Sequence, residues 1–93
     1  MAKRKASVAE LIGRQVVLDT AGSTTYLGTL QAVTPDGFWL KEADFRDRIE
    51  GHATKERYIC EARQEGIRPN RRRVFVFAHV VISVSALDDI IEA

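Results

Sequence analysis

The chain has 93 residues, 45% of them hydrophobic, and its 14 Lys and Arg residues against 13 Asp and Glu residues give a formal net charge of +1. This length suits one domain over residues 1–93 with a small core, which burial against another subunit would help to stabilise. The near-zero charge excludes a strong overall field that would attract nucleic acid from a distance.

The targeting and redox features of the chain are few. Its single cysteine, Cys60, cannot form an internal disulfide, and no apolar run approaches the roughly 20 residues that cross a bilayer. Residues 1–6 are basic but are not followed by the apolar segment of a secretory signal, so we interpret them as a basic tail. These features favour a cytoplasmic protein without a membrane partner.

A short helix followed by three strands is predicted for the first half of the chain. Ser7 and Glu10 fit a capping box, and Gly13 is placed to end the helix. Gly28 lies inside the second strand, where it permits a strong bend or a close backbone approach. Turn residues separate the strands, which we expect at residues 14–20, 24–34 and 38–45.

The third strand carries two large aromatic residues on opposite faces. Phe38 and Trp39 are adjacent, so one of them lies outside the strand's own core, and Trp39 is interpreted as a packing residue rather than a platform for a base.

Residues 46–71 interrupt the strand pattern as a variable loop. Within it, residues 55–65 have helix-forming composition and Gly66 is placed to end a short helix.

Two apolar strands then follow with almost no turn between them. Residues 72–85 are rich in Val, Ile and Phe, interrupted only at Ala78 and His79. A sharply bent ribbon of this kind leaves hydrophobic edge backbone that needs a partner. Residues 87–91 form an amphipathic ending that can dock on the sheet or on a neighbour.

Several of these segments together resemble the Sm-like protein family. Residues 16–18 (VVL), 26–30 (YLGTL) and 40–43 (LKEA) are similar to the first Sm motif, residues 74–84 resemble the second, and residues 87–91 look like the ending of some bacterial and phage members. The resemblance covers residues 7–91. It implies an all-β, five-stranded, strongly bent Sm-like barrel of the SH3 type, with a short N-terminal helix and a helical excursion between the third and fourth strands.

The resemblance also implies a homomeric ring of roughly five to seven copies, in which the fourth strand of one copy pairs with the fifth strand of the next. The alternative is that both strands pair only within one copy. The interface residues expected for the ring are Val74, Phe75, Val76, Phe77, Val80, Val81, Ile82 and Val84.

RNA binding is the function that the resemblance implies, but the residues that select uridine are altered. Thr34 stands where the family has an aspartate, the following turn lacks an asparagine, and Phe77 and Ala78 replace an Arg-Gly pair. We therefore expect single-stranded RNA to be held by phosphate contacts without uridine selectivity. The candidate RNA-binding residues are Arg71, Arg72, Arg73, His79 and Asp36.

These residues can also have structural roles without binding RNA. The arginines can act as gatekeepers beside an aggregation-prone strand, and His79 can be an ordinary turn residue. The alternative function is a ring scaffold that binds protein through the excursion around Tyr58 and Ile59 and does not bind nucleic acid.

The sequence gives no support for catalysis. Its only Cys and His residues are Cys60, His52 and His79, whose spacing suits neither a metal site nor a nucleophilic pair, and no cofactor is expected. An acidic group is interpreted as a solvated strand end and loop: Glu42, Asp44, Asp47 and Glu50.

Overall fold

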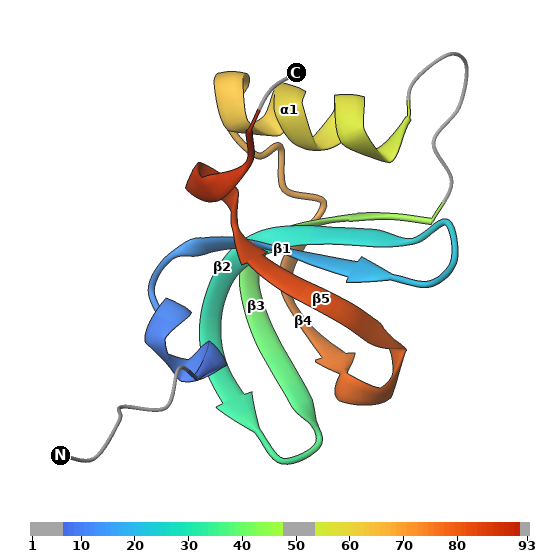
Figure 1. Cartoon of the computed structure of the whole chain (residues 1–93). Coiled ribbons are helices and arrows are strands. Elements are labelled where there is room, and N and C mark those ends of the chain that lie inside the picture. Colours follow the sequence, from blue (N-terminus) through green and yellow to red (C-terminus); the bar gives the residue numbers. More distant parts are fainter. Residues whose placement is uncertain (1–6, 48–53, 92–93) are drawn as a thin grey trace, which may run out of the picture.

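The computed structural model describes residues 7–47 and 54–91. The basic tail at residues 1–6 lies outside the described residues, as do Glu50 and His52 of the variable loop. Figure 1 shows the arrangement of the strands and the α-helix. The elements are β1 (Gln15–Thr20), β2 (Thr25–Thr34), β3 (Gly37–Arg46), α1 (Lys55–Glu65), β4 (Arg71–Phe77) and β5 (Val81–Ala86), with 3₁₀ helices at Val8–Leu11, Ala78–Val80 and Leu87–Asp89.

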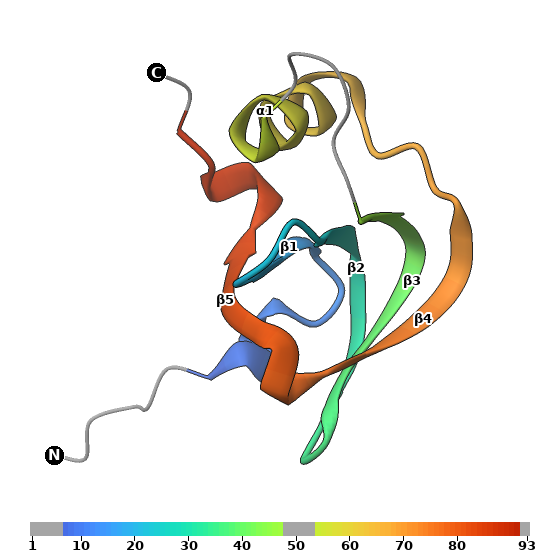
Figure 2. The same cartoon turned by 90° about the vertical axis from the view of Figure 1, so that its right-hand side faces the viewer.

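The strands form one antiparallel sheet of five strands in the order β4-β3-β2-β1-β5. Figure 2 shows how this sheet curls, with β4 and β5 at its two ends and the 3₁₀ turn Ala78–Val80 joining them. The expected all-β, five-stranded and strongly bent fold is confirmed.

The sheet bends at an irregularity in the pairing of β2 with β3. The register between these strands shifts from Leu27↔Asp44 to Thr29↔Lys41, so Gly28 faces a bulge on β3. Glu42 sits in that bulge with a positive φ of 48°. A Cβ at Gly28 would lie only 3.1 Å from the Cα and Cβ of Ala43, so the glycine allows the close backbone approach expected of it.

The inside of the bent sheet holds the main core. Alternation along β1 turns Val16 and Leu18 into it, where both are fully buried, while Val17 faces the other side. Each such side chain contributes on the order of 1.5–3 kcal/mol by leaving water. The other buried members are Leu30, Leu40, Ala43 and Val76.

The N-terminal helix covers this core as a single 3₁₀ turn, with Val8 and Leu11 partly buried against it. Ser7 caps the turn as expected, because its Oγ accepts a hydrogen bond from the Ala9 amide at 3.2 Å. The helix goes no further because the Gly13 amide donates to the Leu30 carbonyl at 2.8 Å, which ties the chain into the sheet.

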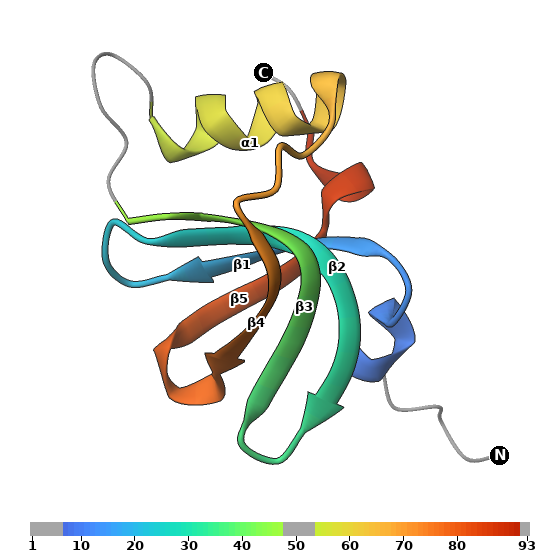
Figure 3. The same cartoon turned by 180° about the vertical axis from the view of Figure 1, so that it is seen from behind.

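A second core lies under α1, at the other end of the sheet from the N-terminal turn (Figures 1 and 3). Val17 and Leu27 of the sheet meet Ile59 and Ala62 of the helix there, together with Leu87. The C-terminal segment therefore docks within its own chain.

Both ends of α1 agree with the sequence prediction. Thr54 caps the first turn, accepting a hydrogen bond at Oγ1 from the Arg57 amide at 3.1 Å, and Gly66 ends the helix with a φ of 93°. Lys55 ties the helix to the end of β1 through its Nζ, which lies 2.8 Å from Oδ1 of Asp19. Within the described part of the chain, α1 and the shorter helices lack the length and apolar character of a membrane span.

Candidate nucleic-acid interface

Three consecutive arginines open the edge strand β4, and all three are exposed. No carboxylate of residues 7–47 and 54–91 lies within ion-pair distance of Arg71, Arg72 or Arg73, and the Arg72 side chain has no polar partner among those residues. Their charges therefore remain available to an anion although the whole chain is nearly neutral.

The flanking arginines rest on aromatic rings. The Arg71 guanidinium lies 5.8 Å from the ring centroid of Phe45. That of Arg73 lies 3.9 Å from the ring centroid of Trp39, while its Nε donates to Oε1 of Gln31 at 2.9 Å. These contacts hold the side chains against the sheet without neutralising them.

His79 and Asp36 lie at the other end of β4. The Asp36 carbonyl accepts a hydrogen bond from the Ala78 amide at 2.9 Å, which joins the β2–β3 turn to the 3₁₀ turn that carries His79. Six residue steps separate Arg71 from Phe77, or about 20 Å of extended strand. The five candidate RNA-binding residues thus form two groups at opposite ends of β4 rather than one cluster.

The β2–β3 turn, where the Sm-like resemblance implies the uridine-selecting residues, is held by hydrogen bonds of its own Thr34 side chain. Oγ1 of Thr34 accepts hydrogen bonds from the amides of Asp36 and Gly37, both at 3.2 Å, and donates to the Gly37 carbonyl at 3.3 Å. The Thr34 hydroxyl is therefore occupied by its own turn.

The predicted interface residues divide into inward and outward side chains. Val76 is 1% exposed and belongs to the core, whereas Phe77, Val80 and Ile82 are 55%, 39% and 65% exposed. The inward ones, which pack against the core, are Val74, Val81 and Val84. Contact between copies through these strands would therefore use the edge backbone and the exposed side chains of Val80 and Ile82.

A β-bulge places Ile82 on the outside of the β5 edge. The register with β1 moves from Asp19↔Ser83 to Thr20↔Val81, which leaves Ile82 as the extra residue. Beside it lies an open depression of about 390 Å³ whose lining includes Tyr26, His79, Val80 and Ile82.

A buried polar cluster connects β3 to α1. The Asp44 side chain accepts a 2.5 Å hydrogen bond from the Tyr58 hydroxyl and lies 3.3 Å from Nε of Arg46. Burial and then this carboxylate raise the pKa of Tyr58 above its ordinary value of 10.0. Asp44 is only 2% exposed, so the interpretation of the acidic group as solvated is wrong for Asp44, although Glu42 and Asp47 are exposed.

The described part of the chain holds no cluster of candidate metal ligands. No group of three or more His, Cys, Asp and Glu side chains there is placed to hold a metal ion. Cys60 is half-buried in α1, and the structure places His79 on the separate turn between β4 and β5.

Sequence reasoning missed the surroundings of Arg73. Gln31 and Trp39 lie on neighbouring strands and hold its side chain, and Phe75 packs against Trp39. The available signal was the spacing of Arg73, Phe75 and Phe77, whose alternation puts them on one face of β4. Their pairing with Trp39 depends on register, which local sequence does not specify.

Comparison with known proteins gives a structural likeness only. No family model and no curated protein matches the sequence. Among solved structures, the Sm protein of Pyrococcus abyssii in complex with a uridine heptamer is similar over 84% of this chain and 89% of its own, with a TM-score of 0.57 and 10% identity.

Two further structures are similar at the same level of fold. A novel Sm-like archaeal protein from Pyrobaculum aerophilum matches 84% of this chain and 46% of its own length, with a TM-score of 0.53 and 18% identity. A chain of the NatC complex bound to CoA matches 90% of this chain and 88% of its own, with a TM-score of 0.57 and 14% identity. Together with the bent sheet and its strand order, these matches show that the chain has an Sm-like fold.

Proposed function

We propose that this chain is a ring-forming protein that binds single-stranded RNA through its arginine edge. The ring would form by antiparallel pairing of β4 in one copy with β5 in the next. Within the described residues, β4 pairs only with β3 and β5 only with β1, so each strand has one edge free. Free edges of this length invite pairing with another chain, and a head-to-tail contact that closes leaves none exposed.

The side chains at the β5 edge support the same contact. Antiparallel pairing of β4 with β5 of the next copy would bring Val80 and Ile82 of that copy against the β4 edge, and both are exposed apolar residues. Burying them would remove apolar surface from water, which is favourable.

The observation that carries RNA binding is the row of unneutralised arginines on an Sm-like fold. Arg71, Arg72 and Arg73 are exposed and have no carboxylate partner among the described residues. A ring repeats this row once per copy, so a flexible strand can contact several rows and gain affinity by multivalency.

The mechanism is electrostatic capture with little choice of base. The Thr34 hydroxyl already makes its hydrogen bonds within the β2–β3 turn, so it offers none to a base. His79 is exposed beside this turn, and it would contact the RNA at the end of β4 away from the arginines. We expect similar affinity for oligo-U and oligo-A.

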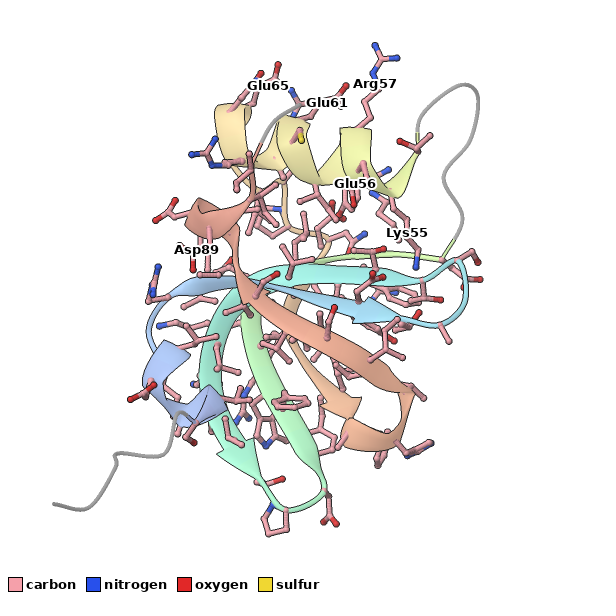
Figure 4. All side chains as sticks on the ribbon, viewed as in Figure 1. Lys55, Glu56, Arg57, Glu61, Glu65 and Asp89 are labelled. Atoms are coloured by element: carbon pink, nitrogen blue, oxygen red, sulfur yellow. The ribbon has the colours of Figure 1, made fainter. Side chains whose placement is uncertain are left out.

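The ring scaffold that binds protein through Tyr58 and Ile59 has less support. Ile59 is 5% exposed, and the Tyr58 hydroxyl is bonded to Asp44. Figure 4 shows that the side of α1 facing away from the sheet carries charged residues, among them Arg57 and Glu61. A partner that docks there would meet a charged surface rather than the two residues proposed.

Filter binding of labelled oligo-U and oligo-A tests the proposal. A variant with Arg71, Arg72 and Arg73 all replaced by alanine should bind both strands more weakly, and its salt dependence should flatten by about 0.7 in log-log slope for each phosphate that the protein no longer neutralises. The matched control removes the same charge from exposed arginines outside β4: Arg14→Ala, Arg57→Ala and Arg68→Ala.

The two variants separate a local site from general charge. Unchanged affinity in the control with a clear loss in the β4 variant supports the proposal. Equal losses in both would show non-specific attraction, and wild-type protein that retains neither strand at modest salt would refute RNA binding.

A further inference from the structure

We propose that the outer face of β3 and β4 carries a strip on which bases of the bound RNA stack. The outer strip is defined as Trp39, Phe75, Phe77 and His79, with Arg73 at one end. This inference rests on the proposed function and adds a second mode of contact to it, because stacking acts on the bases whereas the arginines act on the phosphates.

The register of β3 with β4 brings the side chains of the strip together on one face of the sheet. Trp39 pairs with Phe75, and Gly37 pairs with Phe77. Directly opposite residues in an antiparallel pair share a face, and residues two apart on one strand share it as well. Because Val76 points into the core, its neighbours Phe75 and Phe77 point outward. Figure 3 shows this face of the sheet, with β3 and β4 side by side.

The rings of the strip are contiguous but not stacked on one another. Ring centroids lie 5.0 Å apart between Trp39 and Phe75, 5.1 Å between Phe75 and Phe77, and 5.9 Å between Phe77 and His79. The first two pairs meet edge to face, at 61° and 87°. Such angles leave ring faces that are not covered by another ring of the strip.

Gly37 makes room for this arrangement. A Cβ at Gly37 would overlap the Val76 carbonyl oxygen and would lie 2.9 Å from Cζ of Phe75. The Phe75 ring therefore lies close over the β3 backbone, and Phe77 has no side chain opposite it. Phe77 remains 55% exposed, and His79 is exposed beyond it.

The charge around the strip identifies its occupant. An exposed aromatic surface alone would suit many partners, but this one begins at Arg73, with Arg71 two residues further along the same face of β4, and neither has a carboxylate partner among the described residues. Trp39 already accepts a planar cation, the Arg73 guanidinium, on its face at 3.9 Å. A row of aromatic rings with arginines at one end offers stacking surfaces to bases and positive charge to phosphates, so single-stranded RNA is the partner that this face fits.

Trp39 provides a direct readout because it is the only tryptophan of the chain. The experiment titrates the intact protein with oligo-A and with an abasic ribose-phosphate strand of the same length, and records tryptophan fluorescence and affinity. We expect oligo-A to change the Trp39 emission saturably and to bind about fivefold or more tightly than the abasic strand, whereas the abasic strand leaves the emission unchanged.

Phe77 variants test the strip at an exposed ring that carries no charge. Phe77→Ala should weaken oligo-A binding about fivefold or more without changing the salt slope, and Phe77→Tyr should restore binding. Light scattering on each variant reports assembly, since Phe77 also lies on the β4 edge.

Three results would overturn the inference. Equal binding of oligo-A and the abasic strand with no change in emission would remove the strip and leave the arginine proposal standing. Loss of assembled mass in Phe77→Ala with unchanged oligo-A affinity would identify the strip as a contact between copies. Wild-type protein that binds neither strand would refute the proposed function and the strip with it.

Discussion

Asp44 is the residue on which the attachment of α1 to the sheet depends. Its carboxylate is buried on β3, and it has two partners: the neutral Tyr58 hydroxyl, which donates a hydrogen bond, and the positively charged Arg46 guanidinium. A buried carboxylate is tolerated only when it is paired and hydrogen-bonded. Sequence spacing alone made Asp44 look like one member of an exposed acidic group, because its partner Tyr58 is supplied by a helix 14 residues away.

Tyr58 gives this cluster a measurable pH dependence. The folded protein raises the pKa of Tyr58 above its ordinary value of 10.0, so the phenol contributes stability that is complete below pH 10 and declines as the pH rises through the raised pKa. Tyr58→Phe should cost about 1–3 kcal/mol at neutral pH by removing a partner of a buried charge. Above pH 10, its free energy of unfolding should fall less steeply than that of the wild type.

Urea unfolding at a series of pH values measures both effects. Tyr26→Phe is the control, since it removes the other tyrosine of the chain and leaves the bond to Asp44 intact. The pKa of Tyr26 is also raised, by burial first and then by Asp47, so this control also measures that residue's own share of the alkaline decline. Parallel alkaline slopes for wild type and Tyr58→Phe would contradict the role assigned to Tyr58.

At the scale of elements, local patterns were enough to predict the strands and the helices. α1 has the predicted bounds because its helix-forming composition and its stop at Gly66 are local signals, whereas the cap that Thr54 gives its first turn was not predicted. The three central strands agree with the predictions to within one residue at each end, since their turns are rich in Gly, Pro and Ser.

What the sequence could not supply was the contacts between elements. The bulge that exposes Ile82 depends on the register with β1, and the surface that α1 covers depends on the shape of the completed sheet. The arrangement of Arg73 over Trp39 likewise joins residues 34 positions apart, which no local pattern specifies.

The β5 edge offers a clean test of assembly by mutation. Ile82→Lys places a charge on an exposed edge residue, so the monomer should stay folded while pairing with the next copy is blocked, and the particle mass should fall toward that of one chain. Ile82 suits this test better than Val76, which is 1% exposed and whose replacement would also damage the core.

Light scattering measures the mass, and circular dichroism checks that the variant is folded. Ile12→Lys is the matched control, because Ile12 is 46% exposed and lies outside both edge strands. An Ile82→Lys protein that keeps its wild-type assembled mass would show that the β5 edge does not join one copy to the next.

At the scale of the whole molecule, the strand order determines which backbone edges of the sheet are free. Placing β4 and β5 at opposite ends of the sheet leaves two free edges joined by only one 3₁₀ turn. The edge strand β4 carries the arginine row, and the outer strip lies across β3, β4 and the turn that follows β4. In the proposed function, ring formation and RNA capture are linked, because each added copy would bring one more row of arginines.

Native mass spectrometry of the purified protein tests ring formation most directly. One chain has a mass of 10.4 kDa, and we expect one discrete species at a whole multiple of it, corresponding to roughly five to seven copies, with RNA retained at low salt. A folded protein found only at 10.4 kDa across the micromolar range would contradict the sealing of β4 by β5 of another copy, on which both the ring and the repeated arginine rows depend.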